Sequence, residues 1–253
     1  LGPVLDSMRR LVAAGIWLEV VTLLIPGFND SSEELRDIAR FIAGLGPGVP
    51  WHVTAFHGDY KMSATPDTTA EELVRLMLDG FYENVGEDRI NVPKERGLPF
   101  YQVLTLASIV EREAVLDSER PTIAGVYQNR IDGYKGIAPI LNSDPSVFYA
   151  IDTMKLADMK FDDWQKYVFW APPGTPLAEI AVTEALQGYQ TYQVAGLIPG
   201  PIATPSLPSI DAALEPNTAD GYIYFVAIPD GGGAHDFAKS YKEHQANLKK
   251  YGY

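Results

Sequence analysis

The sequence of 253 residues contains no cysteine. This absence excludes disulfide bonds, thiolate catalysis, zinc–thiolate sites and cysteine-bound iron–sulfur clusters, and it leaves the redox compartment open. Positive charge is also scarce, because 20 lysine and arginine residues face 33 aspartate and glutamate residues, for a formal net charge of −13. An acidic chain repels phosphate backbones and anionic lipid surfaces. We therefore expect no nucleic-acid partner, and a neutral or cationic substrate is favoured.

Long hydrophobic runs are absent as well. The most apolar stretch, residues 11–25, is short for a bilayer span and contains Glu19. We predict no membrane anchor, and no signal peptide is visible. The chain starts at Leu1, which suggests a fragment of a longer product. What the sequence does have is 46% hydrophobic and 11% aromatic residues, which is typical of a globular protein with a real core.

The first 56 residues predict an alternation of helices and strands. Apolar residues at helical spacing indicate a helix over residues 4–14, and an aliphatic run predicts a strand over residues 17–25. Ser31 and Glu34 form a capping box for a second helix, and residues 51–56 predict a second strand. This order is typical of a right-handed parallel β/α unit, of which these residues form only a part.

A stretch of turn residues from His57 to Pro66 marks a change in organisation. We place a domain boundary there, so that the first domain covers residues 1–64 and the second covers residues 65–253. Helices outnumber strands in the second domain, for which we predict an α+β fold. Its predicted elements include helices over residues 101–115, 121–130 and 145–151, and a strand over residues 222–228.

Glu111 is the candidate catalytic residue. It follows two aliphatic residues on a predicted helix, within an otherwise apolar run. Apolar surroundings disfavour a charged carboxylate and raise its pKa, which keeps such a group protonated near neutral pH and able to donate a proton to a leaving oxygen. The alternative is structural: Glu111 forms a capping box with Ser108 or pairs with Arg112 or Arg130 at the surface. Glu113 is expected to point elsewhere around the helix.

Six sequence blocks follow one another between residues 68 and 253. They are LASIVERE from Leu106, AGVYQNR from Ala124, LNSDPSVFY from Leu141, YQTY from Tyr189, GLIPGPIATP from Gly196, and YFV from Tyr224 with GGGAHDF and Glu243-His244 after it. Together they resemble the YceG-like family of endolytic murein transglycosylases. The resemblance implies a YceG-like catalytic domain of the α+β class and matches Glu111 to the catalytic glutamate of the family.

The resemblance also implies a reaction that uses neither cofactor nor metal. Such an enzyme cleaves the β-1,4 bond between N-acetylmuramic acid (MurNAc) and N-acetylglucosamine (GlcNAc) without water, because the 6-hydroxyl of MurNAc attacks its own anomeric carbon. One carboxyl group, here Glu111, protonates the leaving oxygen and then accepts the proton of that hydroxyl. The implied substrate is the peptidoglycan strand, the implied partner is the cell-wall synthesis machinery, and the implied location is the outer face of the cytoplasmic membrane. The alternative is an inactive glycan-binding or scaffold remnant.

Four candidate substrate-binding residues lie in the third and fourth blocks. Asp144 precedes a proline and is either a helix N-cap or a hydrogen-bonding group near the site. Tyr189 and Tyr192 either stack on sugar rings or pack against protein. Gln190 is a further candidate, at a position where the family pattern leads us to expect asparagine.

His235 is the fifth candidate substrate-binding residue. It follows a run of glycines and could hydrogen-bond the substrate or position Glu111. His244 is the one other histidine nearby in the sequence, so we expect no metal site.

The first 64 residues resemble a different family. LEVVTLLIPGFND from Leu18 and PWHVTAFHGDYKM from Pro50 are similar to the later β/α units of a radical S-adenosylmethionine enzyme of the AmmeMemoRadiSam or pyruvate formate-lyase activating type. The cluster motif CxxxCxxC is absent, so that chemistry is excluded. We expect a partial, barrel-derived β/α fragment joined to the second domain near residues 62–68, whether by natural fusion, by design or by error in assembly.

Overall fold

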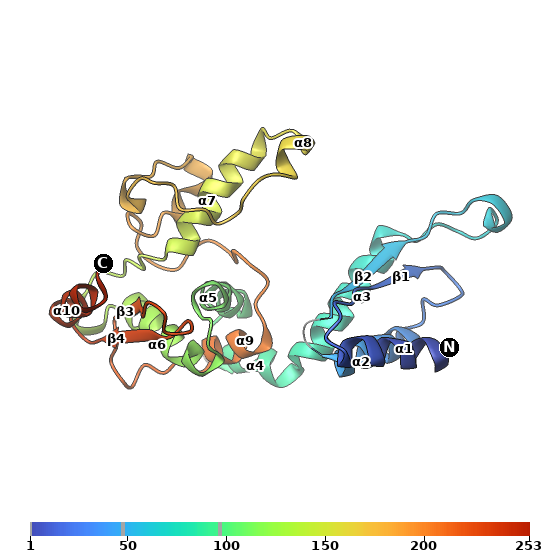
Figure 1. Cartoon of the computed structure of the whole chain (residues 1–253), viewed down its shortest axis with the longest axis horizontal. Helices are drawn as coiled ribbons and strands as arrows, with labels where there is room; N and C mark the ends of the chain where they lie inside the picture. Colours follow the sequence, from blue (N-terminus) through green and yellow to red (C-terminus); the bar gives the residue numbers. More distant parts are fainter. Residues whose placement is uncertain (1, 47–48, 96–97) are drawn as a thin grey trace. The chain divides into compact units, whose positions relative to one another are not determined.

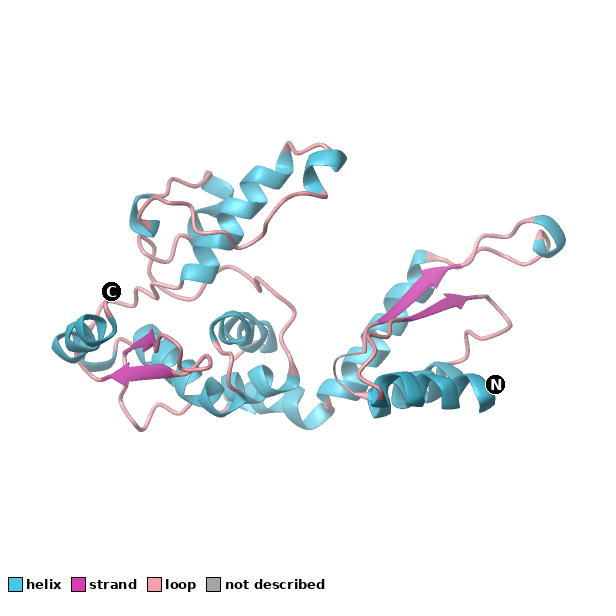
Figure 2. Ribbon diagram, in the orientation of Figure 1, coloured by secondary structure: helices cyan, strands magenta, loops and turns pink. Residues whose placement is uncertain are grey.

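The structure, a computed structural model, describes residues 2–46, 49–95 and 98–253. The chain divides into two compact units, Leu1–Gly86 and Glu87–Tyr253. Within the described residues the fold is mostly helical, with two small sheets of two strands each (Figures 1 and 2). No helix in this described part is long and apolar enough to cross a bilayer. These elements confirm the predicted α+β class, with helices more prominent than strands.

The first unit contains a parallel β/α arrangement. β1 (Val20–Leu24) pairs with β2 (Trp51–Ala55) so that Val20 lies opposite Trp51. α1 (Gly2–Ala13) precedes β1, α2 (Ser32–Leu45) connects the strands, η1 (Tyr60–Met62) is a short 3-10 helix, and α3 (Ala70–Val85) closes the unit. The Ser31 hydroxyl accepts a hydrogen bond from the Glu34 N–H at the start of α2. The predicted order of helix, strand, helix and strand is confirmed.

The segment around residue 65 is hydrogen-bonded to both strands of this unit. The hydroxyl of the buried Thr68 donates to the Leu24 carbonyl (2.6 Å) and accepts from the Phe56 N–H (2.9 Å). Asp67 accepts a bond from the Gly58 N–H (2.7 Å). The compact unit therefore extends past residue 64 and ends at Gly86. The proposed division into residues 1–64 and 65–253 concerns ancestry and stays a prediction. With two strands in its sheet, the described unit gives no support to the barrel-derived origin.

The second unit is a set of packed helices around α5 (Phe100–Glu113), which contacts four other helices. Its residues from Thr105 to Val110 are all buried, because neighbours cover every side of the helix. The remaining helices are α4 (Glu87–Glu95), α6 (Arg120–Ile131), α7 (Asp144–Ala157), α8 (Phe161–Trp164), α9 (Leu207–Leu214) and α10 (Tyr241–Tyr251). The 3-10 helices are η2 (Asp117–Glu119), η3 (Tyr134–Gly136), η4 (Leu177–Glu179) and η5 (Glu184–Tyr189).

An antiparallel hairpin completes the second unit. β3 (Tyr224–Ala227) pairs with β4 (His235–Ala238), and α10 packs against both strands. The strand predicted over residues 222–228 is confirmed, whereas β4 was not predicted. The helix predicted over residues 101–115 ends two residues earlier, and α7 continues past its predicted end.

Gly125 marks a close approach of α6 to another segment. A side chain at this position would place its Cβ 2.0 Å from the Asn217 carbonyl oxygen. The approach brings the Asn129 amide, one turn further along α6, within hydrogen-bond distance of the Tyr222 carbonyl (2.9 Å). A glycine is therefore needed for α6 to pack beside the chain that leads into the hairpin.

Candidate active site

The last turn of α5 carries two glutamates, Glu111 and Glu113. Residues two apart on a helix point to different sides of it. The two carboxyl groups therefore meet different parts of the second unit, and their surroundings give them different charge states.

The Glu111 carboxylate binds the start of α9. Its Oε2 accepts hydrogen bonds from the Ser206 hydroxyl (2.6 Å), the Ser206 N–H (3.0 Å) and the Ser209 hydroxyl (2.7 Å). Arg120 Nη1 lies 3.3 Å from the same oxygen. Ser206 is the N-cap residue of α9 and makes no side-chain cap of its own, so Glu111 supplies the cap from another helix.

These contacts decide the charge of Glu111. Burial raises its pKa, but the hydrogen bonds from Ser206 and Ser209 and the positive charge of Arg120 outweigh burial, and the pKa lies below its ordinary value. The prediction of a raised pKa for Glu111 is therefore wrong. The predicted capping box is also absent from this site, because the Ser108 hydroxyl donates to the Thr105 carbonyl instead (2.7 Å).

Glu113 lies in the surroundings that were expected for Glu111. Its Oε1 accepts hydrogen bonds from the Tyr127 hydroxyl (2.5 Å) and from the Ser143 hydroxyl (3.4 Å). Burial of the carboxyl group, followed by the charge of Asp144, raises the pKa of Glu113 to about 7, although both hydrogen bonds and Arg112 act in the opposite direction. The residue keeps part of its surface exposed. Glu113 thus has a carboxyl group with a pKa near neutral pH, on a residue that is not completely buried.

Asp144 and Tyr192 lie beside this carboxyl group. The Tyr192 hydroxyl donates to Asp144 (2.5 Å), and burial together with Asp144 raises the pKa of Tyr192. The N-cap of α7 is Ser143, so the alternative of Asp144 as an N-cap is wrong. Thr191 joins the two segments, because its hydroxyl donates to the Ser143 carbonyl (3.0 Å) and accepts from the Ser143 N–H (2.9 Å).

Tyr189 and Gln190 are held by protein contacts. The Tyr189 ring packs at 4.9 Å from the Tyr149 ring. Gln190 is completely buried, and its amide donates to the carbonyls of Leu177 (3.1 Å) and Ile180 (2.7 Å). A side chain without exposed surface cannot contact a substrate, so the structure gives Gln190 a role in fixing the loop that leads to Tyr192.

His235 is paired with Glu119 and not with Glu111. Its ring Nδ1 lies 2.8 Å from Glu119 Oε2, and its backbone N–H donates to Glu119 Oε1 (3.1 Å). Both side chains are mostly buried. The His235 ring packs edge-on against Phe225 (5.3 Å), which in turn packs against Tyr127 (6.0 Å). The contacts described for His235 thus connect it to the Glu113 site through aromatic packing and do not include Glu111, while a hydrogen bond from His235 to a substrate stays a prediction.

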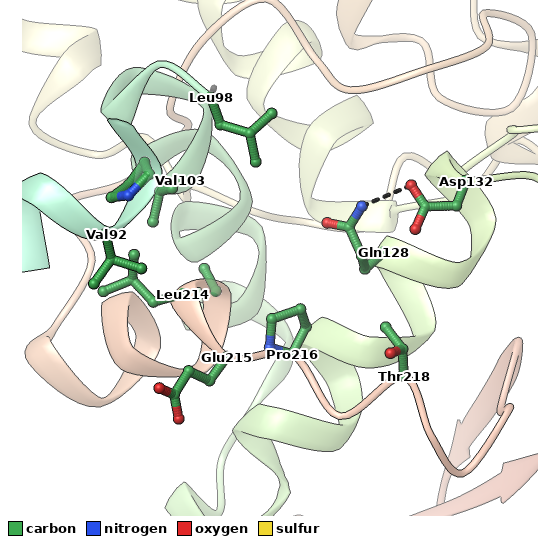
Figure 3. A pocket seen from close by; sticks show the side chains of 11 residues that line it. Val92, Leu98, Val103, Gln128, Asp132, Leu214, Glu215, Pro216 and Thr218 are labelled. Carbon is green, nitrogen blue, oxygen red and sulfur yellow. Dashed lines mark hydrogen bonds between the residues drawn. The ribbon is translucent and has the colours of Figure 1, made fainter. Parts of the chain in front are cut away.

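A cavity of about 470 Å³ lies in the second unit (Figure 3). Its lining includes Leu98, Val103 and Leu214, and Gln128 donates to Asp132 within it (2.9 Å). Neither Glu111 nor Glu113 belongs to this lining. Across residues 2–46, 49–95 and 98–253, no group of three or more metal-ligating side chains is close enough to hold an ion.

Sequence reasoning missed Glu113, Tyr127 and Ser143. Periodicity does not separate the two glutamates, because Glu111 follows the buried Ala107 and Glu113 follows the buried Ile109 by one helical turn each. Tyr127 and Ser143 lie in the second and third sequence blocks, and their place in these blocks is the signal that could have indicated a role in the site. A hydroxyl-bearing residue in each block next to an acidic helix end indicates a shared polar site.

Comparisons with known proteins agree with the resemblance of the second region. An endolytic murein transglycosylase of Bacillus subtilis (strain 168) is 31% identical over 190 residues, which are 74% of this chain and 44% of that protein. An endolytic murein transglycosylase of Streptococcus pneumoniae serotype 2 (strain D39) is 28% identical over 191 residues, covering 75% of this chain and 30% of that protein. The chain thus spans less than half the length of these curated relatives.

A solved structure supports the same fold. The crystal structure of a putative YceG-like protein from Listeria monocytogenes matches with a TM-score of 0.52 and 28% sequence identity, over 72% of this chain and 49% of that one. None of these three matches supports the predicted radical S-adenosylmethionine resemblance of residues 1–64. The model of the YceG-like family matches residues 50–250, and it therefore begins earlier than the predicted start at residue 68. Because this match covers most of the sequence, the chain belongs to the YceG-like family.

Proposed function

We propose that this chain is an endolytic murein transglycosylase in which Glu113 is the general acid and base. The observation that carries the proposal is the carboxyl group of Glu113, with a pKa of about 7 and with Tyr127, Ser143 and Asp144 around it. The relatives named for this activity support the reaction class. A general acid works best when its pKa lies near the working pH, and Glu113 meets this condition whereas Glu111 does not.

The reaction needs one carboxyl group. Neutral Glu113 donates its proton to the glycosidic oxygen as the bond from that oxygen to C1 of MurNAc breaks, which releases the 4-hydroxyl of GlcNAc. Positive charge develops at C1, and the Asp144 carboxylate is the nearby anion that stabilises it. The 6-hydroxyl oxygen of MurNAc then bonds to C1, and its proton passes to the Glu113 carboxylate. The 1,6-anhydro end forms without water and Glu113 is neutral again.

Tyr127 and Ser143 prepare Glu113 for this double role. Both donate hydrogen bonds to the same oxygen, Oε1. That oxygen is thereby fixed as an acceptor, which leaves Oε2 to carry the transferred proton. Burial raises the pKa of Tyr127 well above its ordinary value, so its hydroxyl remains a donor throughout the reaction.

The test compares Glu113→Gln with Glu111→Gln on purified murein, with anhydro-ended products counted by mass spectrometry. Removing the general acid should lower the rate at least roughly 100-fold. Glu111→Gln weakens the cap of α9 but leaves Glu113 in place, so we expect measurable cleavage together with a lower melting temperature. Full activity of Glu113→Gln, with loss of activity in a folded Glu111→Gln, would return the catalytic role to Glu111.

A second candidate function is a glycan-binding or scaffold protein without catalysis. The observation that favours it is coverage, since the chain matches 44% and 30% of the two transglycosylases. Sedimentation with insoluble murein separates the two cases: binding without any anhydro product supports the second function, and turnover excludes it. In either case we propose peptidoglycan strands as the ligand, the cell-wall synthesis machinery as the partner, and the outer face of the cytoplasmic membrane as the location.

A further inference from the structure

An aromatic segment returns along α7 after α8 (Figure 1). We call residues 167–173, with the sequence YVFWAPP, the aromatic strap. Asp152, a buried residue of α7, accepts a hydrogen bond from the Tyr167 hydroxyl (2.6 Å) and another from the Trp170 N–H (3.0 Å). One buried carboxylate therefore fixes the strap at two points, one at each end of its aromatic stretch.

The strap holds Trp170 in an unusual conformation. Its φ angle is 61°, in the left-handed region that bulky residues rarely adopt. The guanidinium group of Arg112 lies over the indole ring, 4.1 Å from its centre. Such strain persists where surrounding contacts enforce it, and it is common at ligand-binding sites. Asp152 binds the backbone N–H of Trp170, so this hydrogen bond does not depend on the indole ring.

Arg112 also connects the strap to the proposed catalytic group. It lies between Glu111 and Glu113 in the last turn of α5, and its charge acts on the Glu113 carboxyl group. A single side chain thus lies within interaction range of Glu113 and in direct contact with Trp170. The strap therefore contacts the end of α5 that carries Glu113.

The strap exposes apolar and aromatic surface at this place. Phe169 is 42% exposed and Val168 is 70% exposed, while Trp170 is partly exposed. The Phe169 ring is braced edge-on by Tyr167, with 5.1 Å between the ring centres. Rigid exposed aromatic rings beside a guanidinium group suit a sugar, whose ring carries C–H bonds on its face and polar groups at its rim.

We propose that the aromatic strap binds a sugar residue of the glycan strand next to the bond cleaved at Glu113. This inference rests on the proposed function. A glycan strand is a polymer, so it continues beyond the bond held at Glu113 and contacts whatever surface adjoins that site. Phe169 and Trp170 offer ring surface to the sugar, and Arg112 offers donors to its hydroxyl, acetamide or lactyl groups.

The experiment uses the full chain carrying Glu113→Gln, so that bound murein is not cleaved. In this background we compare Trp170→Gly and Phe169→Leu by sedimentation with insoluble murein. Glycine adopts a φ of 61° without strain, so the strap keeps its backbone, and leucine keeps an apolar side chain without the ring. Each change should weaken binding roughly 3- to 10-fold. The control is Tyr253→Leu, which removes an exposed aromatic ring outside the strap and should leave binding unchanged.

The outcomes separate this proposal from the proposed function. Unchanged binding by both strap variants, with normal melting temperatures, would refute the glycan subsite even if Glu113→Gln abolishes cleavage. Weakened binding in the strap variants alone, in a chain whose wild type yields no anhydro product, would support the subsite and refute the enzyme. Equal weakening in all three variants would show that binding does not depend on the strap, and it would overturn the proposal as well.

Discussion

The two compact units differ in how their polar and apolar side chains are packed and exposed. In the second unit, the buried Arg130 side chain donates hydrogen bonds to the carbonyls of Ile223, Ile140 and Leu141. In the first unit, apolar side chains stay exposed, including Trp17, Val21 and Met77, and α1 has no buried residue among those described. The second unit therefore has the specific packing that can hold a reactive carboxyl group at a defined pKa.

The cavity in the first unit is larger than the one described in the second. It has a volume of about 820 Å³, against about 470 Å³, and lies between α2, β2 and α3. Both units have a sheet of two described strands, so unpaired strand edges do not distinguish them. We infer from the contrast that the first unit is the less stable of the two.

The largest effect should come from separating the units. A chain that begins at Glu87 should unfold cooperatively and keep murein cleavage, since the proposed site lies entirely within residues 87–253. A chain that begins at Thr68 keeps α3 without the sheet to which Thr68 is bonded, and it should be less soluble. Thermal unfolding and cleavage assays of both chains test this. If neither chain unfolds cooperatively, the two units form one folding unit, and the inference that the first unit is the less stable one is wrong.

The next prediction compares the loss of unfolding free energy when one arginine is replaced in each unit. Arg130→Met should lower the free energy of unfolding by about 3–5 kcal/mol, because three buried carbonyl groups lose their donor. Arg36→Met should cost less than about 1 kcal/mol, since its ion pair with Glu83 is solvent-exposed. Urea denaturation of both variants measures the difference. Similar losses in the two would show that the first unit is as specifically packed as the second.

The third prediction concerns how the raised pKa of Glu113 makes the free energy of unfolding depend on pH. Its folded-state pKa is raised from 4.5 to about 7, so the folded chain binds more protons than the unfolded chain between these values. Stability therefore falls as the pH rises through this window, by roughly 3 kcal/mol in total. Glu113→Gln should remove this loss, and its stability relative to the wild type should increase from pH 4 to pH 8. A constant difference in urea denaturation across that range would show that the pKa is not raised.

Local sequence signals predicted much of the fold. The hydroxyl of the capping residue Ser31 accepts a hydrogen bond from the backbone N–H of Glu34, three residues on, so neighbouring residues were enough to predict the start of α2. The strand β4 was not predicted because it has four residues and includes His235 and Asp236, which are uncommon in a short strand.

The assignment within the site could not be made locally. Glu111 meets Ser206, which lies 95 residues away, and Glu113 meets Ser143, which lies 30 residues away. Burial raises the pKa of both carboxyl groups, and the distant partners decide whether they outweigh it, as they do for Glu111 and do not for Glu113. The resemblance matched Glu111 to the catalytic glutamate, whereas the contacts and pKa values lead us to propose Glu113 for that role.

The smallest predicted effect concerns the charge next to Glu113. Asp144→Asn removes a negative charge that raises the pKa of Glu113, so the pKa should fall and the alkaline limb of the cleavage profile should move to lower pH. The shift should be smaller than the effect of burial, which is the larger cause. Tyr192→Phe is the matched control, because it removes the hydroxyl that donates to Asp144 but leaves the carboxylate. A profile that moves equally in both variants would mean that the contact between Tyr192 and Asp144, and not the charge, tunes the acid.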